Sequence, residues 1–336
     1  MRTVFVTGAT GFIGRNLVAA LLDRGDRVRC LVRAADRAGP LERDGVQIVR
    51  GSLDDVAAWR GELRGCEQVF HVGGLVAARR RDDFATINGH ATAALADACA
   101  SLESPPTFLF LSSLAAAGPG PEGGGPRRER DPFAPVSNYG ASKLLAEREL
   151  RRRSGRLPIT SLQPGAVFGP HDPKILALYQ MIDTARLHLP VGWRRVPLSL
   201  VHVTDLVDFV IAAADRGERM SPTDEDASGV YHVCDDREYP TWGQLGQRIA
   251  RGLGRSVLVV PFPALVVWPA VAAIEAFWNL VGQPSIVSRD KLREATARSW
   301  AASAAKARDH LGFAPAATLD ARLRETGDWF RTQGLL

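Results

Sequence analysis

Residues 2–14 read Arg-Thr-Val-Phe-Val-Thr-Gly-Ala-Thr-Gly-Phe-Ile-Gly, and this stretch decides the fold class. The β-branched and aromatic run at 3–6 is typical of a short buried strand. Three glycines follow it directly: Gly8, Gly11 and Gly14. Apolar residues then recur at helical spacing as far as Leu22, and Gly25 ends the pattern. The sequence therefore predicts a strand, a glycine turn and a helix, in that order.

A turn of this kind suits a pyrophosphate. Glycine has no Cβ, so phosphates can approach the backbone closely. The start of the following helix supplies free N–H groups and the positive end of the helix dipole. The spacing here is G-x-x-G-x-x-G, whereas dinucleotide folds more often carry G-x-G-x-x-G. A strand–helix loop without a ligand is the alternative interpretation, and the strand–turn–helix context favours the phosphate site.

The composition is that of an ordinary globular protein with a basic surface. The chain has 336 residues, 46% of them apolar and 24% charged, which allows one large domain with a smaller annex. The net charge of +5 comes mostly from scattered arginines. We interpret these as a solvated surface and expect no nucleic-acid partner. The four cysteines are far apart in sequence and are expected to be reduced core thiols, and no metal site is expected.

Strands and helices alternate along the first half of the chain. Further strands are predicted at 27–32, 46–49, 69–72, 107–111 and 159–162, and the helices between them at 53–63, 84–101 and 138–153. This alternation predicts an α/β fold with a Rossmann-type doubly wound parallel sheet. Continuous apolar strands such as 108–111 fit a sheet that is covered on both faces.

The second half of the chain loses this strict alternation. Helices are predicted at 203–214, 241–253, 303–311 and 319–331, and a strand at 229–233. We therefore expect a Rossmann domain at 1–169, to which later segments such as 199–215 return. Residues 170–336 are expected to form mainly a smaller, discontinuous C-terminal substrate lobe.

Two further segments are open to more than one interpretation. Residues 118–132 are rich in glycine and proline and predict a loop at the carboxyl edge of the sheet, either a mobile cover or a surface loop without a role. Residues 257–274 are apolar and near the length of a membrane span, but three prolines interrupt them. They predict a short strand, a turn and an apolar helix that Glu275 ends. Peripheral membrane contact is the second interpretation of this segment.

Tyr139 and Lys143 are the candidate acid/base pair. On a helix, residues four apart share one face. A phenol titrates near pH ~10 and is a poor proton carrier at neutral pH, but a neighbouring ammonium favours the phenolate and lowers the phenol's pKa. Such a pair is a plausible general acid/base. An exposed helix pair is the alternative, and the position after the fifth predicted strand favours chemistry.

The octet Thr-Gly-Ala-Thr-Gly-Phe-Ile-Gly at 7–14 resembles the cofactor motif of the extended short-chain dehydrogenase/reductase family. The Ser-Ser pair at 112–113 and Tyr-x-x-x-Lys at 139–143 resemble the family's catalytic set. The resemblance implies that Ser113 hydrogen-bonds the reacting oxygen, that Tyr139 transfers its proton, and that Lys143 holds the nicotinamide ribose. Ser112 is the second choice for the serine. The resemblance implies these cofactor-binding positions: Thr7, Gly8, Thr10, Gly11, Phe12, Ile13, Gly14, Ser52, Leu53, Val72, Gly73, Gly74, Ser112, Tyr139, Lys143, Pro164, Gly165 and Val167.

Several positions depart from the family pattern. Ser52 stands where the family usually has an aspartate that contacts the adenine, so that contact is in doubt. The segment at 163–170 is similar to Arg-Pro-x-x-Val-Tyr-Gly-Pro, with glutamine for arginine and phenylalanine for tyrosine. Arg33 follows the second predicted strand, where NAD-binding folds usually place an acid, and the next acid is Asp36. An arginine there suits a 2′-phosphate, so NADP is the preferred cofactor, and NAD is the alternative.

The resemblance implies an NAD(P)-dependent oxidoreductase that acts on a carbonyl or secondary alcohol, nearest to the 3β-hydroxysteroid dehydrogenase and dihydroflavonol reductase branch. The apolar run at 197–201 and the segment 257–274 favour a fairly apolar small-molecule substrate. A nucleotide-sugar epimerase or dehydratase with the same triad is the rival within the fold. A non-catalytic NADP-binding scaffold or sensor is the rival of another class, because fold alone does not fix function. A homodimer is expected, and the first strand beginning almost at Met1 predicts a cytoplasmic protein, with membrane association as the alternative.

Overall fold

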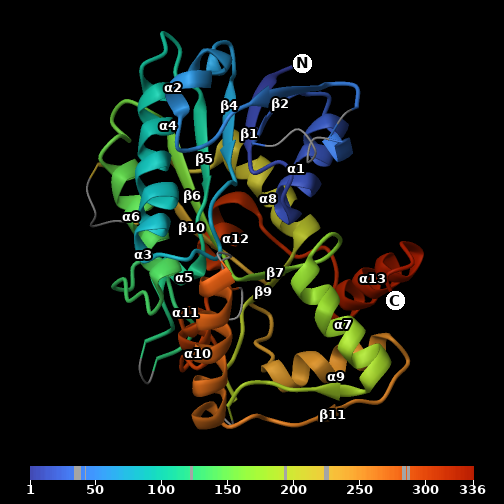
Figure 1. The fold of residues 1–336 in the computed structure, drawn as a ribbon. Helices are drawn as coiled ribbons and strands as arrows, with labels where there is room; N and C mark the ends of the chain where they lie inside the picture. The colour runs from blue at the N-terminus through green and yellow to red at the C-terminus, as the bar shows by residue number, and fades with distance from the viewer. Residues whose placement is uncertain are drawn as a thin grey trace.

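A seven-stranded sheet with the strand order β10-β6-β5-β4-β1-β2-β3 forms the centre of the protein (Figure 1). The computed structural model describes residues 1–33, 39–41, 43–121, 124–192, 195–222, 227–281, 285 and 288–336. Every neighbouring pair in this sheet is parallel. The strands are β1 (Thr3–Thr7), β2 (Arg27–Val32), β3 (Val46–Arg50), β4 (Gln68–His71), β5 (Thr107–Leu111), β6 (Ile159–Pro164) and β10 (Val230–Val233). The six strands predicted in the first half of the chain are confirmed, each to within two residues at its ends. The strand predicted at 229–233, which was expected in the C-terminal lobe, is β10 and lies at the edge of this sheet.

The order of the strands fixes where a ligand can bind. From β1, the chain runs outward to β2 and β3, and then crosses back to β4 on the other side of β1. The crevice at such a switch point, beside the carboxyl ends of the strands, is where ligands bind in doubly wound sheets. The glycine turn after β1 opens into that crevice. The predicted α/β Rossmann-type fold is thus confirmed.

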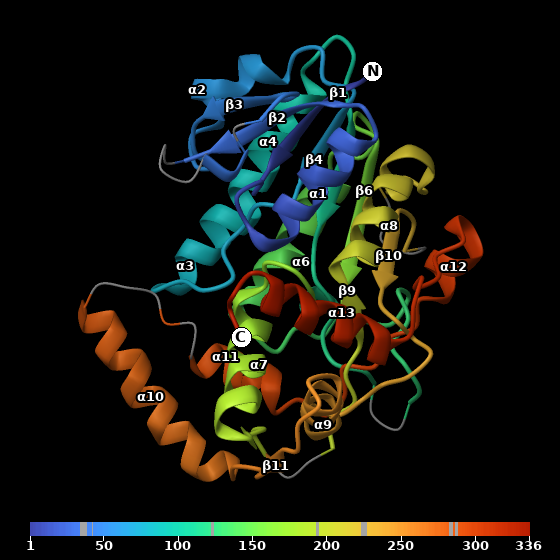
Figure 2. The same ribbon diagram turned by 90° about the vertical axis from the view of Figure 1, so that its right-hand side faces the viewer.

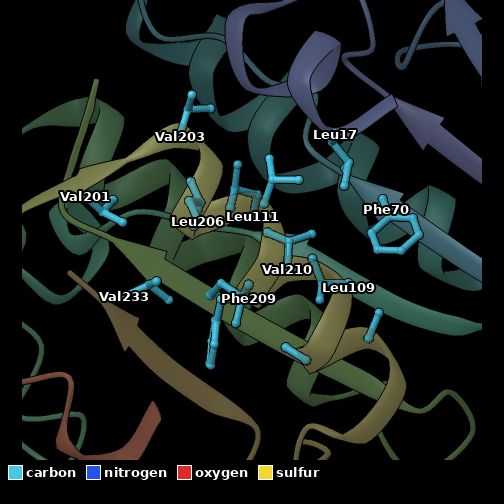
Figure 3. Packing of buried hydrophobic residues seen from close by; sticks show 14 of the residues in the cluster. Leu17, Phe70, Leu109, Leu111, Val201, Val203, Leu206, Phe209, Val210 and Val233 are labelled. Carbon is cyan, nitrogen blue, oxygen red and sulfur yellow. The ribbon is translucent and has the colours of Figure 1, made fainter. Parts of the chain in front are cut away.

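Helices cover both faces of the sheet (Figure 1). One face carries α1 (Phe12–Asp23) and α8 (Val203–Arg216), whose apolar sides pack on the sheet around Leu17, Phe70 and Val210 (Figure 3). The other face carries α2 (Val56–Trp59), the 3₁₀ helix Arg60–Leu63, α4 (Ala91–Ala100) and α6 (Asn138–Arg151). Because both faces are covered, the apolar runs in β1 and β5 are buried on both sides, as their sequences indicated.

A second core lies beside the carboxyl edge of the sheet. It is formed by α7 (Pro173–Ala185), α9 (Trp242–Gly252) and α13 (Leu319–Thr332), with large apolar side chains at its centre: Tyr179, Ile182, Leu245, Ile249, Leu253, Leu323 and Phe330. Two small parallel sheets belong to this part: β7 (Ala166–Phe168) with β9 (Leu200–His202), which lies next to the main sheet, and β8 (Leu187–His188) with β11 (Leu258–Val259), at the far end (Figure 1). The helix α12 (Ala305–Leu311) lies near β10. The domain boundary at 169/170 stays a prediction.

Helix ends differ from the sequence-based expectation where capping groups intervene. The helix expected at 53–63 begins only at Val56, because the Asp55 side chain accepts a hydrogen bond from the N–H of Ala58 and caps it there. The helix expected at 84–101 is divided into α3 (Arg81–Phe84), a π-helical turn (Ala85–His90) and α4. Three helices were not expected from the pattern: α5 (Leu114–Ala117), α7 and α11 (Arg289–Ala295).

The segment predicted at 257–274 contains a longer helix than expected. Its helix, α10, runs from Ala264 to Val281 and projects from the rest of the chain (Figure 2). Glu275 does not end this helix, because glutamate is readily accommodated in a helix. Its carboxylate pairs with Arg289 Nε at 2.7 Å. Over the described residues, α10 and every other helix fall short of the length and apolar character that crossing a bilayer requires.

The exposed apolar surface of this segment lies further along the chain than the sequence indicated. Phe262 is 41% exposed, as expected, whereas Trp268 is half-buried. Leu265 and Val266 have side chains outside the described residues. Leu258 is also exposed, and a group of exposed apolar residues gathers in the last turns of α10: Phe277, Trp278, Leu280 and Val281.

Two smaller expectations concern the cysteines and the loop 118–132. Cys30, Cys66, Cys99 and Cys234 are all free and buried, as expected for core thiols. The described part of the loop packs on the sequence around 299–303. There, the N–H of Arg127 donates to the carbonyl oxygen of Ala301 at 2.9 Å, and the N–H of Ser303 donates to that of Arg127 at 2.8 Å. The Arg127 side chain is buried, so this part of the loop is fixed to the protein.

Candidate active site

The glycine turn after β1 is closed by contacts that leave no room for side chains. Gly8 has a φ of +74°, and a Cβ there would lie 2.6 Å from the N atom of Gly73. A Cβ on Gly14 would lie 2.1 Å from the carbonyl oxygen of Gly8. Glycine is therefore required at both positions. Gly8 needs it because of its positive φ and the close contact, and Gly14 needs it because of the close contact alone. The predicted order of strand, glycine turn and helix is confirmed, and the turn lies against the residues that follow β4.

The start of α1 fits a dinucleotide phosphate. Gly11 is the N-cap of α1, and no side chain among the described residues caps this helix. The first-turn N–H groups, those of Phe12, Ile13 and Gly14, are therefore available to an anion at the positive end of the helix dipole. Thr10 lies beside this turn, and its carbonyl oxygen accepts a hydrogen bond from Arg15 Nε at 3.1 Å.

Residues from three strand ends meet beside the turn. The N–H of Gly73, after β4, donates to Thr7 Oγ1 at 3.1 Å. A Cβ on Gly73 would lie 3.2 Å from Leu53, which follows β3. Ser52 is half-buried next to Leu53, and its carbonyl oxygen accepts from Trp59 Nε1 at 2.8 Å. The structure therefore brings these predicted cofactor positions together around one crevice.

A buried chain of hydrogen bonds links the first strand to the catalytic helix. Thr7 Oγ1 lies 2.7 Å from His71 Nδ1, and His71 Nε2 lies 2.8 Å from Thr92 Oγ1. Thr92 Oγ1 donates to the carbonyl oxygen of Asn88 at 2.7 Å, and Asn88 Nδ2 donates to Ser142 Oγ at 2.9 Å. Burial, helped by the charge of Lys143, lowers the pKa of His71 to about 3, so its ring is neutral. A neutral ring can accept one hydrogen bond and donate the other, which orders this chain.

Asn88 lies in the π-helical turn and faces the site. Its Oδ1 accepts from the N–H of Leu75 at 2.7 Å, and its Nδ2 also donates to the carbonyl oxygen of Leu75 at 2.9 Å. These bonds fix the chain just after Gly74. A Cβ on Gly74 would lie 2.8 Å from Asn88 Oδ1 and 3.4 Å from Lys143 Nζ. Single π-helical turns often occur at functional sites. This one places Asn88 next to Gly74, on the side where Lys143 Nζ also lies.

Tyr139 and Ser113 meet at the carboxyl edge of the sheet. Ser113 is the N-cap of α5, where its Oγ accepts from the N–H of Ala115 at 3.2 Å. Burial raises the pKa of Tyr139 to about 12, while a hydrogen bond from the Ser113 hydroxyl works in the opposite direction. Tyr139 therefore carries its proton at neutral pH and can donate it. The Ser112 hydroxyl is buried on another side, next to Glu147, which favours Ser113 as the serine beside the phenol.

Lys143 is fixed on the same face of α6, one turn after Tyr139. Its Nζ donates to the carbonyl oxygen of Leu111 at 2.8 Å and lies 4.8 Å from the centre of the Phe110 ring. Burial lowers the pKa of Lys143 to about 8, and the carboxylate of Glu147 opposes this change. At neutral pH, the side chain is therefore an ammonium held close to the crevice. The predicted pairing of Tyr139 with Lys143 on one helix face is confirmed.

The remaining predicted positions lie at or just beyond the carboxyl ends of β6 and β2. Pro164 ends β6, Val167 lies in β7, and a Cβ on Gly165 between them would lie 2.4 Å from the carbonyl oxygen of Ser199. Arg33 is exposed directly after β2, and none of the described residues is its hydrogen-bond or ion-pair partner. Asp36 lies outside the described residues.

The apolar run at 197–201 is part of the protein core in the structure. The apolar run at 197–201 was expected to indicate an apolar substrate. Leu198 and Leu200 are instead buried in the core formed with α7 and α9. The apolar character of this run therefore reflects packing within the protein, and it says nothing about the substrate.

The helix α11, which was not expected from the sequence pattern, contacts the start of α6, the helix that carries Tyr139 and Lys143. Three of its side chains reach that helix: Asp290, Lys291 and Glu294. Ser288 caps α11 and accepts from the N–H of Lys291, so a serine before a charged helical stretch was the available signal. No sequence pattern, however, indicates that this helix meets Tyr139, which precedes Asp290 by 151 positions.

The glycine turn, its free helix start and the Ser113–Tyr139–Lys143 group together fit a nicotinamide dinucleotide. When bound, that cofactor would supply or accept a hydride. The chain's own residues would hold the phosphates at α1, exclude water below Gly73 and Gly74, and carry the proton at the Tyr139 hydroxyl. The observation that supports this fit is the start of α1, where no side chain among the described residues caps the N–H groups of the first turn.

Comparison with known proteins agrees with this geometry. Residues 4–228 match the family described as the NAD dependent epimerase/dehydratase family. The chain is 30% identical over 335 residues to a ceramide reductase of Caulobacter vibrioides (strain NA1000 / CB15N), covering 99% of this chain and 96% of that protein. It is 24% identical to a UDP-glucose 4-epimerase of Vibrio cholerae, covering 98% of this chain and 95% of the relative.

Among solved structures, the UDP-glucose 4-epimerase of Thermotoga maritima aligns with a TM-score of 0.79 at 21% identity, covering 98% of this chain and 99% of that one. At this identity, the likeness to the solved structure shows the fold alone. The family match covers residues 4–228. The chain belongs to the NAD dependent epimerase/dehydratase family, the extended short-chain dehydrogenases/reductases, and is an NAD(P)-dependent oxidoreductase.

Proposed function

We propose that this protein transfers a hydride between NADP(H) and a carbonyl or secondary alcohol of a lipid-like substrate. The observation that carries the proposal is the position of α10, an exposed apolar helix. The next helix of the chain, α11, places Lys291 Nζ 4.3 Å from the centre of the Tyr139 ring. The apolar surface of α10 is thus linked to Tyr139 through α11, which contacts both.

The surface of α10 is suited to an apolar molecule. Phe277 is 59% exposed and Leu280 is 88% exposed, and Trp278 packs edge-on against Phe277 with ring centres 5.8 Å apart. Exposed apolar groups that gather in one place usually mark an interaction site. Tryptophan is favoured where one side is apolar and the other is wet, because its ring carries a polar N–H. We expect this surface to bind the apolar chain of the substrate. Contact between α10 and a membrane would bring the protein to a substrate that lies in the bilayer.

The relatives support a lipid-like substrate and leave the rival open. The ceramide reductase matches along nearly the whole chain, including the region of α10 and α11. The epimerase of Vibrio cholerae matches over a similar length with lower identity. A nucleotide-sugar epimerase or dehydratase is therefore the second candidate function, because it would use the same serine, tyrosine and lysine.

In the proposed reduction, each residue has one role. The Tyr139 hydroxyl donates its proton to the carbonyl oxygen, and Ser113 hydrogen-bonds that oxygen and orients it. Lys143 holds the nicotinamide ribose, and its ammonium favours the phenolate that remains. The elevated pKa of Tyr139 in the free protein keeps the proton available for this direction of the reaction.

NADP is the proposed cofactor because of Arg33. Its exposed guanidinium follows β2, where the ribose of the adenosine part lies in such folds. An arginine there can pair with a 2′-phosphate, and none of the described residues already neutralises it. NAD remains the alternative cofactor.

Assembly and location complete the proposal. Family resemblance suggests that α4 and α6 pair across a two-fold axis, since a two-fold dimer is the commonest closed oligomer. We expect a cytoplasmic homodimer that touches membranes through α10. Light scattering at micromolar concentration would show the mass of a dimer, and a monomer mass would contradict this part.

A substrate panel tests the function directly. The purified protein is mixed with NADPH and, in turn, a long-chain ceramide-like ketone, a steroid ketone or a flavonoid ketone, and in a separate arm with NAD⁺ and UDP-glucose. We expect consumption of NADPH, followed by its absorbance, with the long-chain or steroid ketone. Interconversion of UDP-glucose and UDP-galactose, measured by chromatography because it consumes no NADPH, would instead support the epimerase. The Tyr139→Phe variant is the control in every arm.

A further inference from the structure

The start of the catalytic helix α6 is held by α11, a helix from the far end of the sequence. The N–H of Asn138 donates to Asp290 Oδ1 at 2.6 Å, and the N–H of Tyr139 donates to Asp290 Oδ2 at 3.2 Å. The third N–H of this turn, that of Gly140, donates to Ser137 Oγ at 2.9 Å. All three N–H groups that begin the helix are thus satisfied, two of them by one carboxylate of α11.

The same helix places two opposite charges beside the phenol. Lys291 Nζ lies 4.3 Å from the centre of the Tyr139 ring, within the range of a cation–π contact. Glu294 Oε2 pairs with Lys291 Nζ at 2.8 Å. Glu294 Oε1 accepts from Ser137 Oγ at 2.6 Å, which ties the pair to the N-cap of α6. The ring of Phe84 packs edge-on against Tyr139 from another side, with ring centres 6.3 Å apart.

We propose that Lys291 and Glu294 are positioning residues that set the proton affinity of the Tyr139 hydroxyl, and that Asp290 fixes the helical turn that carries it. This proposal rests on the proposed function for its kinetic consequences. It also makes a prediction about the phenol itself, which holds whatever the substrate is.

The two charges act with opposite signs. An ammonium over the ring stabilises the phenolate and makes the proton easier to lose, and a carboxylate nearby does the reverse. The carboxylate of Glu294 does raise the pKa of Tyr139, after the larger effect of burial. Since Lys291 and Glu294 also pair with each other, each one screens the other. Removing either should therefore expose the effect of the one that remains.

Other charges around the phenol are accounted for. Lys143 lies on α6 itself, and Asp290 contacts the backbone of its first turn. Lys174 on α7 is close enough to Lys291 and Glu294 for both to influence its pKa, which burial lowers. All three residues are kept in variants at 291 and 294, so differences among such variants report on the α11 pair together with its effect on Lys174.

The experiment compares Lys291→Met, Glu294→Gln and the double variant in alcohol oxidation with NADP⁺, where Tyr139 must accept a proton. We expect the apparent pKa of kcat to move upward in Lys291→Met and downward in Glu294→Gln, each by about one pH unit, the scale of a partly desolvated ion near a ring. In the double variant, the apparent pKa should return close to that of the parent, because both charges are gone.

Arg293→Met is the matched control, since it removes an exposed cation from the same helix, and its guanidinium is 4.0 Å from Asp290. We expect no change in its pH profile. If Lys291→Met and Glu294→Gln shift the profile in the same direction, or lower kcat equally at every pH, α11 has only a structural role and the proposal is wrong.

A measurement without substrate separates this proposal from the proposed function. Carbon-13 labelling of the tyrosine ring, with the Tyr139 signal assigned by Tyr139→Phe, follows the phenol directly by NMR. Glu294→Gln should move its titration to lower pH, where it is easily observed. A shift in this titration without turnover of any ketone would keep the α11 inference and remove the proposed substrate. Turnover without any shift would do the opposite.

Discussion

The glycine turn between β1 and α1 and the contact between α11 and α6 both position reactive groups, but they are built in different ways. The chain of the turn is continuous, and backbone atoms fill the space in which a Cβ could stand: those of Gly8 and Ala9 at Gly14, and those of Val72 and Gly73, after β4, at Gly8. The α11 contact joins residues at least 151 positions apart through side-chain charges. The first is fixed by sterics, and the second is held by electrostatics.

This difference predicts how each region responds to substitution. The atoms around Gly8 and Gly14 belong to the backbone and not to flexible side chains. A single added methyl group must therefore displace the chain. A charged contact at a helix start can lose one partner and still keep the helix, because helix formation also rests on the apolar packing of α6. We therefore expect changes at the turn to abolish cofactor binding, and changes at α11 to tune the chemistry.

The largest effect is expected at the group that both regions serve. Tyr139→Phe removes the proton carrier and keeps the ring that packs against Phe84. Turnover should fall by at least ~100-fold, the usual scale of lost general acid/base catalysis, while NADPH titrates with nearly unchanged affinity. Tyr239→Phe is the matched control, because that hydroxyl donates to the carbonyl oxygen of Ala302 at 2.8 Å, within the protein. Activity within a few-fold of the parent in Tyr139→Phe would contradict the assignment.

The next effect is expected at the turn. Gly14→Ala places a methyl group where a Cβ lies 2.1 Å from the Gly8 carbonyl oxygen. We expect a loss of about 1–3 kcal/mol in the free energy of unfolding, typical of overpacking, and no measurable NADPH binding. Gly61→Ala is the control, since no heavy atom lies within 4 Å of a Cβ there. Thermal unfolding and fluorescence titration measure the two quantities, and retained NADPH affinity would show that the phosphates bind elsewhere.

A smaller effect is expected at Arg33, which lies at the same edge of the sheet but outside the closed turn. Arg33→Asp places a carboxylate near a 2′-phosphate, so the ratio of NADH to NADPH affinity should rise by about tenfold, or about 1.4 kcal/mol. Arg27→Asp, at the opposite end of β2, is the control. Titration of both cofactors decides the matter, and an unchanged ratio would make Arg33 a surface arginine only.

The smallest effect on stability is expected on α10. The double change Phe277→Ser with Trp278→Ser alters exposed residues, so the free energy of unfolding should change by no more than about 0.5 kcal/mol per site. KM for long-chain ketones should rise several-fold, and sedimentation with phospholipid vesicles should decrease. Phe133→Ser, which changes a residue 40% exposed on another segment, is the control. A large drop in the melting temperature would show that α10 is part of the core.

The sequence by itself determined the fold class and half of the site. A strand, glycines and a helix in immediate succession leave few alternatives, because the glycines are needed wherever backbones approach so closely. Alternating strands and helices then dictate a parallel sheet, and its central strands lie where the apolar runs placed them. Tyr139 and Lys143 share a helix face because their spacing is local.

The tertiary structure decided what depends on distant partners. The π-helical turn that carries Asn88 has no clear local signal, and its bonds to Leu75 and Ser142 form only after folding. The run at 197–201 is apolar because of the second core, which the pattern of that run alone cannot show. The placing of Asp290, Lys291 and Glu294 against α6 also depends on the whole chain, since charges on a short helix look alike in sequence whether they face solvent or a catalytic tyrosine.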